Sequence, residues 1–338
     1  MAVAAPPSTL LDVHGLRVRV QGDWREVIEG LRLDFAWFQR AGAHDGPVDV
    51  EVEVRRTAPR FDAFGDLRAS FVTPRNVVYQ QGDRKIVEYF GRALSTLDPT
   101  TGRLVVEGED RELVHEAAYH FLISRIGEHI DAIGLTRLHG LGLSGAGGAV
   151  VLMLPSGGGK STLVMRALRD ERVRLLSEDT PLLDRHGRLY PFPLRIGINA
   201  TDADQLPDGA VRRIERMEFH PKLALELEAF AHRIEPSPQP LRHLVIGRRS
   251  LGRDAHLEPV GRRAAVGPLL REAVVGVGVY QGMEFILQRG LRDVVGKLDV
   301  AARRSASCGR ALARVRVWRL TLGRDRERNW AALRSLLS

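Results

Sequence analysis

Residues 149–162 read AVVLMLPSGGGKST, the most informative pattern in the chain. The six apolar residues at its start predict a short strand buried on both faces, as in the centre of a parallel sheet. Three glycines and a Lys-Ser pair follow, and apolar residues then recur at helical spacing over residues 162–169. A second short apolar run at residues 173–176 predicts the next strand. Strand, glycine-rich loop, helix and strand form the βαβ arrangement that places phosphate groups at a helix N-terminus.

Each residue type in the glycine-rich loop has a chemical use in binding a nucleoside triphosphate. Backbone N–H groups converge on phosphate oxygens only where side chains are absent, which the three glycines allow. Lys160 is expected to reach the β- and γ-phosphates and Ser161 to offer its hydroxyl to Mg²⁺, while the helix dipole adds a favourable field. We therefore expect ATP and Mg²⁺ as cofactors. The expected nucleotide-binding residues are Ser156, Gly157, Gly158, Gly159, Lys160, Ser161 and Thr162.

One position departs from the usual phosphate-loop pattern GxxxxGK[ST], because Leu154 stands where that pattern has its first glycine. A side chain at this position requires a different entry turn, and Pro155 is the candidate to hold that turn. The alternative interpretation of the loop is a glycine-rich turn or helix cap that binds nothing. The Lys-Ser pair and the preceding strand favour the phosphate site.

Two carboxylates, Glu178 and Asp179, follow closely on the strand predicted at residues 173–176. Ligands of open α/β sheets collect at the carboxyl ends of strands, so these side chains are expected at the phosphate site. We assign Asp179 to Mg²⁺ together with Ser161, and Glu178 to accepting the proton of the attacking hydroxyl as a general base. The two roles could be exchanged. The structural alternative is that the pair only caps the segment that follows.

These features resemble the HPr kinase/phosphorylase family and the broader set of HPr-kinase-related kinases, which share a phosphoenolpyruvate-carboxykinase-like nucleotide-binding core. The resemblance covers residues 138–198 and rests on His139-Gly140, the apolar strand, the glycine-rich loop, and Glu178-Asp179, where the family usually has two aspartates. It implies that His139 lies beside the nucleotide phosphates as a catalytic residue, although a histidine before a strand is by itself more often structural. Arg195 is a candidate phosphate or substrate ligand, or else a surface arginine.

Upstream of this core, the first hundred residues alternate apolar and polar side chains as half-buried strands do. Strands are expected, in an antiparallel arrangement with a hairpin turn at residues 81–83, over residues 14–20, 48–54, 76–80, 85–90 and 103–107. Helical spacing over residues 112–133, closed by Gly134, predicts a long helix.

The expected fold class is α/β, and the resemblance implies a P-loop core of the HPr-kinase/phosphoenolpyruvate-carboxykinase type with an N-terminal β-rich α+β module. In this organisation residues 1–110 are the β-rich N-terminal module and residues 111–136 are a linking helix. Residues 137–338 are then a P-loop kinase domain with a basic C-terminal region.

Lysine is an uncommon choice in this chain, since only four of the 50 basic residues are lysines. Besides Lys160, Lys222 stands out because it precedes apolar residues at helical spacing over residues 223–230. A lysine there could neutralise charge that moves onto the transferred phosphoryl group, so Lys222 is a candidate catalytic residue. The alternative is an ordinary lysine at a helix start.

The formal charge of +8 is concentrated near the C-terminus, where residues 289–338 hold thirteen basic residues against four acidic ones. Such a region could attract an acidic partner or be the solvated surface of an arginine-rich protein. The single cysteine, Cys308, permits no internal disulfide and is interpreted as structural. The chain has no run of 18 apolar residues and no secretory signal pattern, so we expect no membrane partner and a cytoplasmic location.

The expected function is that of an ATP-dependent kinase, which transfers the γ-phosphoryl group to a hydroxyl of a peptide, a protein or a small molecule. HPr itself is not implied, because the family's C-terminal signature is not recognisable, whereas the resemblance does imply a homo-oligomer. A nucleotide-sensing regulatory or nucleic-acid-binding module without phosphotransfer stays open, as does a carboxykinase acting on a carboxylated metabolite. The pair Glu178-Asp179 favours the kinase over the sensor, because a sensor needs no proton acceptor beside its metal ligand.

Overall fold

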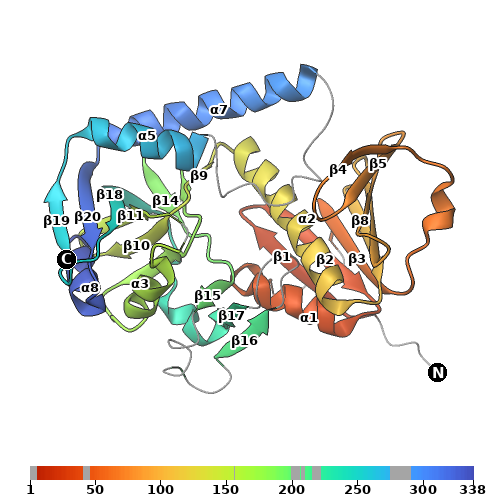
Figure 1. Ribbon diagram of the computed structural model, residues 1–338, viewed down its shortest axis with the longest axis horizontal. Helices are drawn as coiled ribbons and strands as arrows, with labels where there is room; N and C mark the ends of the chain where they lie inside the picture. The colour runs from red at the N-terminus through yellow and green to blue at the C-terminus, as the bar shows by residue number, and fades with distance from the viewer. Residues whose placement is uncertain are drawn as a thin grey trace. The chain divides into compact units, whose positions relative to one another are not determined.

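The computed structural model describes residues 6–40, 46–155, 157–198, 206, 210–214, 222–274 and 291–338 (Figure 1). The chain divides into two compact units. The first contains Met1–His129 with the short segments Arg213–Lys222 and Gln281–Leu287, and the second contains Ile130–Arg212, Leu223–Tyr280 and Gln288–Ser338. Each unit has its own β-sheet and its own helices, so the protein has a mixed α/β fold.

The first unit is built on an eight-stranded sheet. In spatial order its strands are β1 (Ser8–Val13), β2 (Leu16–Gly22), β3 (Val50–Arg56), β8 (Arg103–Gly108), β7 (Ala93–Asp98), β6 (Arg84–Glu88), β5 (Val77–Gln81) and β4 (Ala69–Val72). The sheet is accompanied by helix α1 (Arg25–Asp34) and the short 3₁₀ helices η1 (Ala36–Phe38) and η2 (Phe61–Phe64).

The sequence predicts an antiparallel arrangement for this sheet, but some of its neighbouring strands run parallel. Strand β3 runs parallel to both β2 and β8, and only the remaining neighbours are antiparallel. The antiparallel prediction is wrong here because α1 lies between β2 and β3 in the chain. A crossover of that length returns the chain to the same end of the sheet, which a tight hairpin cannot do.

Two local predictions, a hairpin turn in this unit and the long helix that leads out of it, are confirmed. Strands β5 and β6 pair from Gln81 with Arg84, which leaves a two-residue hairpin turn, and Gly82 has the positive φ of +59° that such turns favour. The long helix is α2 (Arg111–Ala132), and Gly134 follows it with a φ of +80°. Because glycine has no Cβ, it adopts this left-handed conformation without strain and ends the helix.

The second unit is built on a nine-stranded mixed sheet. Its main path runs β12 (Arg174–Ser177), β10 (Leu141–Gly145), β11 (Gly148–Met153), β18 (Gln239–Arg249), β14 (Arg188–Tyr190), β13 (Leu182–Leu183) and β9 (Thr136–Arg137). Strand β20 (Arg316–Leu322) pairs with β18 and with β19 (His256–Pro259). A smaller sheet has the order β15 (Ile196–Ile198), β17 (Lys222–Leu225) and β16 (Val211–Ile214).

The strands at the centre of the large sheet share one direction. Strand β11 is buried along its whole length and runs parallel to β18, which in turn runs parallel to β20. Strand β10 lies between β11 and β12 and is antiparallel to both. Strands β11 and β12 therefore point the same way, and their carboxyl ends lie at the same edge of the sheet.

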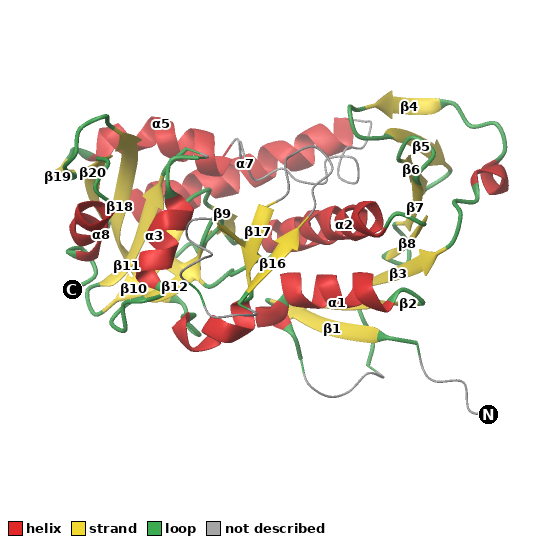
Figure 2. Ribbon diagram, turned by 60° about the horizontal axis from the view of Figure 1, so that its bottom comes forward, coloured by secondary structure: helices red, strands yellow, loops and turns green. Residues whose placement is uncertain are grey.

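Helices cover this sheet, as Figure 2 shows for α3 (Lys160–Ala167) and α8 (Arg326–Arg334), which pack against each other. The remaining helical segments are η3 (Leu227–Arg233), η4 (Arg262–Ala265), α5 (Val266–Leu269), the π-helical turn η5 (Leu270–Val274) and α7 (Leu291–Leu312). Alternate residues of β11 pack in a buried cluster with α5, η5 and α7, and the cluster includes Cys308. None of the helices in the described ranges combines the length and the apolar character needed to span a bilayer.

The helix predicted over residues 223–230 is wrong. Residues 222–225 form strand β17, and the chain becomes helical only at η3, as a 3₁₀ helix. Strand β17 pairs antiparallel with β15, from Ile196 opposite Leu225 to Ile198 opposite Leu223. A few apolar residues at helical spacing are a weak preference, and pairing with a neighbouring strand overrides it.

The basic C-terminal region is part of the folded core of the second unit. It contributes α7, β20 and α8, and β20 lies beside β18 in the large sheet. The buried thiol of Cys308 has its pKa raised to about 11 by burial. A thiol that stays protonated at neutral pH is a poor nucleophile, in agreement with the structural interpretation of this cysteine.

Candidate functional site

The loop between β11 and α3 has a backbone that requires glycine. Gly157 and Gly159 have φ values of +74° and +107°, a region that residues with a side chain rarely adopt. A Cβ on Gly158 would lie 2.5 Å from Leu154 Cγ and 2.8 Å from the carbonyl oxygen of Pro155. The turn is closed by the Gly158 amide, which donates to that same oxygen at 2.9 Å. Ser156 lies outside the described residues.

Leu154, at the unusual position of the loop pattern, is accommodated by two glycines. Its side chain is 3% exposed and fills the space that a Cβ on Gly158 or on Gly247 would need, the latter at 2.6 Å from Leu154 Cδ1. Gly247 belongs to β18, the parallel neighbour of β11. The leucine therefore packs between the loop and the sheet, and its carbonyl oxygen accepts a hydrogen bond from Lys160 Nζ at 3.1 Å.

The common edge of β11 and β12 brings the two acidic residues to the loop. Ser161 Oγ donates to Glu178 Oε1 at 3.1 Å, and Lys160 Nζ lies 3.0 Å from Asp179 Oδ1. Both carboxylates are partly exposed, whereas Lys160 is only 7% exposed. The two adjacent carboxylates thus contact two different residues of the loop, one the hydroxyl and the other the ammonium.

His139 lies at the centre of the same cluster. Its Nε2 is 3.1 Å from Asp179 Oδ1 and 2.8 Å from Lys160 Nζ, and its Nδ1 is 2.7 Å from Glu272 Oε2. The backbone fixes this arrangement, because the His139 amide donates to the Glu272 carbonyl oxygen at 3.1 Å and the Gly140 amide to that of Asp179 at 2.9 Å. His139 and Glu272 are both nearly buried.

The charges of this cluster shift the pKa values of two of its members. The hydrogen bond to Asp179 raises the pKa of His139 above its usual value, although burial and the Lys160 charge oppose this. Burial alone would raise the pKa of Asp179, but the hydrogen bond from His139 and the charge of Lys160 lower it to about 2. Asp179 is therefore ionised at neutral pH, and the doubly protonated imidazolium is the form of His139 that both carboxylates favour.

Glu272 was not found by sequence reasoning. It lies 133 residues from His139 in the chain, within the π-helical turn η5. Single π-helical turns occur often at functional sites, but the sequence carries no motif around this residue. Arg271 Nε contacts the second carboxylate oxygen, Glu272 Oε1, at 2.7 Å, and Arg304 Nη1 donates to the carbonyl oxygen of Ala273 at 3.3 Å. These contacts hold the glutamate in place.

The other residues proposed from the sequence lie elsewhere or are not described. Lys222 begins β17, but its side chain is outside the described residues. Arg195 is half-buried and directly precedes β15. Thr162 lies in the first turn of α3 and lines a separate cavity, which neither Glu178 nor Asp179 borders.

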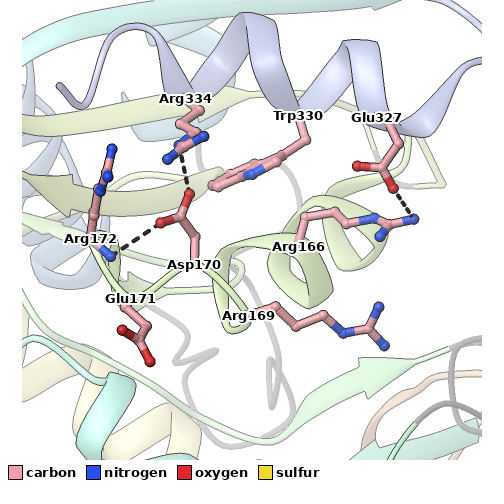
Figure 3. A pocket seen from close by; sticks show the side chains of 8 residues that line it. All are labelled: Arg166, Arg169, Asp170, Glu171, Arg172, Glu327, Trp330 and Arg334. Carbon is pink, nitrogen blue, oxygen red and sulfur yellow. Dashed lines mark hydrogen bonds and ion pairs between the residues drawn. The ribbon is translucent and has the colours of Figure 1, made fainter.

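A pocket of about 390 Å³ between the last turn of α3 and α8 is a weaker candidate (Figure 3). Its side chains largely neutralise one another, since Arg166 pairs with Glu327 at 2.7 Å and Arg334 pairs with Asp170 at 2.6 Å. Trp330 fills the space between these two ion pairs (Figure 3). Paired charges on a shallow surface favour helix packing over ligand binding.

No protein-family model matches this sequence, and no curated protein sequence matches it either.

Proposed function

We propose that the protein is an ATP-dependent kinase with a P-loop core of the HPr-kinase-related type, and that it transfers the γ-phosphoryl group to a hydroxyl of a peptide, a protein or a small molecule. One observation carries the proposal: a glycine-rich loop with Lys160 and Ser161 lies against the carboxylates Glu178 and Asp179. Phosphoryl transfer needs little more than this, because its catalysis consists mostly of positioning and of charge stabilisation.

The loop fits the phosphates of a nucleotide. Three successive residues without side chains leave room for phosphate oxygens at the start of α3, where the first backbone N–H groups have no partner within the helix. Lys160 is buried beside them, and its ammonium is held by Leu154, His139 and Asp179. The Lys160 ammonium could exchange these protein partners for phosphate oxygens when a nucleotide binds.

Mg²⁺ would be held by Ser161 and Glu178, whose oxygens are already 3.1 Å apart. In phosphate sites Mg²⁺ is usually coordinated by one or two carboxylates together with ligand phosphates and water. When bound, it would neutralise negative charge on the phosphates. Within the described ranges no group of three or more His, Cys, Asp and Glu side chains is arranged to bind a metal, so the protein would contribute only part of the coordination. These contacts favour exchanging the roles first assigned to Glu178 and Asp179.

Asp179 is then the residue that accepts the proton of the attacking hydroxyl. It lies at the ammonium of Lys160, where the terminal phosphate would bind, and it is ionised at neutral pH. As the acceptor oxygen forms its bond to the γ-phosphorus, the bond to the bridging β–γ oxygen breaks, ADP leaves, and the hydroxyl proton passes to the Asp179 carboxylate. His139, supported by Glu272, orients that carboxylate and offsets its charge.

The test compares three substitutions with a matched control. Lys160→Ala should abolish ATP binding at millimolar nucleotide. Glu178→Gln should raise the Mg²⁺ concentration needed for half-maximal ATP binding, while Asp179→Asn should bind ATP within a few-fold of wild type and lose transfer by on the order of 10²-fold. Glu171→Gln, at a side chain 89% exposed, should change neither property. Calorimetry measures binding, and mass spectrometry of serine-containing peptides incubated with ATP and Mg²⁺ measures transfer.

The outcomes separate the proposed kinase from its alternatives. An absence of ATP binding by the wild-type protein would remove the nucleotide site. ATP binding that depends on Lys160, without any transfer to peptides or water that depends on Asp179, would instead favour the nucleotide-sensing module. If Asp179→Asn alters Mg²⁺ dependence and Glu178→Gln alters transfer, the original assignment of Asp179 to the metal and Glu178 to the proton holds.

A further inference from the structure

A second cavity adjoins the glycine-rich loop, and neither Glu178 nor Asp179 is among the residues that line it. Its volume is about 230 Å³. Four of its lining residues come from the loop and the first turn of α3, and the others come from the ends of β18 and β20, from the link between β20 and α8, and from α8. They are Gly157, Gly159, Thr162, Leu163, Arg249, Leu322, Gly323, Arg324, Arg326 and Asn329. Because β18 and β20 run parallel to β11, all these chain ends meet at one edge of the sheet.

Three arginines and no acidic residue line this cavity. Among the described residues, no carboxylate forms an ion pair with Arg249 or Arg324, whereas Arg328 on the same helix as Arg326 pairs with Asp254 and Asp325. The guanidinium of Arg249 lies over the loop, since a Cβ on Gly159 would be 3.2 Å from its Nη1 atom. The cavity therefore offers hydrogen-bond donors directly beside the phosphate-binding backbone.

Part of the cavity wall is apolar, and its base is well fixed. Leu163 and Leu322 are buried, at 3% and 1% exposure. The side chain of Asn329 accepts from the Gly323 amide at 2.9 Å and donates to the Gly323 carbonyl at 3.0 Å, so it holds the chain between β20 and α8. Asp325 caps α8 by accepting from the amides of Glu327 and Arg328. Arg324 and Arg326, on either side of the cap, thus extend from a rigid base.

The cavity and the acidic cluster are bordered by different residues of the loop and of the first turn of α3. The ammonium of Lys160 points to Asp179 and His139, while Gly159 and Thr162 border the cavity. A triphosphate lying along the loop with its terminal phosphate at Lys160 would direct its other end towards the arginines. The volume is below the roughly 300–1,000 Å³ of complete ligand sites, so the cavity would hold part of a ligand whose remainder lies outside it.

We infer that this cavity is the nucleoside subsite, which holds the base and ribose of the triphosphate between Leu163, Leu322 and the guanidinium groups. The inference rests on the proposed function and adds to it the residues that recognise the nucleoside. Arginine suits the position, because its planar guanidinium stacks on aromatic bases and also hydrogen-bonds phosphate oxygens. Arg249, which lies over Gly159, contacts the ribose, and Arg324 contacts the base.

The experiment compares ATP with inorganic tripolyphosphate, which has the same chain of phosphates and no nucleoside. Both are titrated with Mg²⁺ by calorimetry into the wild-type protein, Arg324→Leu, Arg249→Gln and Arg328→Leu. Arg324→Leu should raise the Kd for ATP by about 10-fold, the loss of one good stacking contact, and change that for tripolyphosphate by less than about 3-fold. Arg328→Leu removes the same charge from a residue outside the cavity and should change both Kd values equally and slightly.

Arg249→Gln supplies a second variant from a different element, in case Arg324→Leu does not fold. It should weaken ATP more than tripolyphosphate as well. Equal weakening of both ligands by the two cavity variants would overturn the inference, since the arginines would then only attract negative charge. Unchanged ATP affinity with a raised KM for an acidic peptide would also overturn it and favour the acidic partner considered from the sequence. Neither result would affect the proposed kinase, provided that Lys160→Ala still abolishes binding of both ligands.

Discussion

His139 is a residue whose ionisation depends on neighbours that come from three separate parts of the chain. Asp179 and Glu272 each accept from one ring nitrogen, and Lys160 lies against the nitrogen that faces Asp179. The two carboxylates favour the imidazolium, and the lysine and burial disfavour it. The neutral ring can accept from Lys160 through Nε2 while it still donates to Glu272. His139 can therefore hold the network together in either protonation state.

The ionisation of His139 can be measured against an internal reference, His243. The pKa of His139 should lie above 6.5, chiefly because of its hydrogen bond to Asp179. The pKa of His243 should lie below 6.5, because burial, Arg316 and Arg242 disfavour its charged form. NMR titration of the imidazole resonances, assigned with the variants His139→Gln and His243→Gln, would show the two midpoints on opposite sides of 6.5.

The raised pKa of His139 also predicts how the free energy of unfolding changes with pH. Because the folded-state pKa of His139 exceeds the unfolded value, the imidazolium stabilises the fold below about pH 6.5, and this contribution is lost as the pH rises through the raised pKa. The difference in free energy of unfolding between wild type and His139→Gln should thus shrink from pH 6 to pH 9. In Asp179→Asn the midpoint of His139 should fall. A midpoint that stays in place would show that Asp179 is not the main cause.

At the scale of elements, α7 is attached to the end of α2 by a buried ion pair. Arg304 is 3% exposed, and its Nη2 lies 2.8 Å and 2.7 Å from the two carboxylate oxygens of Asp131. The same guanidinium donates to the carbonyl oxygen of Ala273, the residue after Glu272. One arginine on α7 thus fixes both the end of α2 and the turn that carries a member of the candidate site.

Arg304→Leu should destabilise the protein by about 3–5 kcal/mol, because it leaves the Asp131 carboxylate largely buried with Arg137 as its one remaining ion-pair partner among the residues that the structure describes. The neighbouring Arg303 is the matched control, since it is 48% exposed and pairs with Asp299, which is 64% exposed. Surface pairs of this kind contribute about 0–1 kcal/mol, so Arg303→Leu should be nearly neutral. Urea denaturation of both variants measures the difference. Equal effects of the two substitutions would show that the Asp131 contact adds little.

At the scale of the whole molecule, Cys308 reports on unfolding, because it is the only cysteine of the chain. It is 5% exposed in the core of the second unit, and its raised pKa leaves little thiolate at neutral pH. A thiol reagent should therefore react slowly with the folded protein and rapidly once the unit opens.

If the proposed nucleotide site is present, ATP with Mg²⁺ should slow the labelling of Cys308 in moderate urea. A ligand that binds only the folded state lowers the open fraction, so each tenfold rise in ATP above its Kd should slow labelling about tenfold. Lys160→Ala should show no such protection, and labelling in high urea should not depend on ATP. Protection of Lys160→Ala equal to that of wild type would place the nucleotide elsewhere in the molecule.

Much of the local structure could be predicted from the sequence. The strand of residues 149–154, the helix after the glycine-rich loop, the helix ended by Gly134 and the turn at Gly82 are all present. Each follows from interactions among residues a few positions apart, such as a φ that only glycine adopts easily or an apolar run that must be buried. That Glu178 and Asp179 lie at the loop also follows from one short crossover, whereas it is Glu178, and not the Asp179 expected there, that contacts Ser161.

The sheet order and the contacts that depend on it were decided only by the tertiary structure. Strand β10 lies between β11 and β12, residues 222–225 pair as a strand with β15, and Glu272 reaches His139 across 133 residues. The cavity lined by Arg249, Arg324 and Arg326 likewise joins the glycine-rich loop with the ends of β18 and β20. These pairings depend on how distant segments share one buried core and saturate one another's backbone hydrogen bonds. A local sequence pattern does not specify which strands pair, because several neighbouring strands could form equally good backbone hydrogen bonds with a given strand until the whole sheet is assembled.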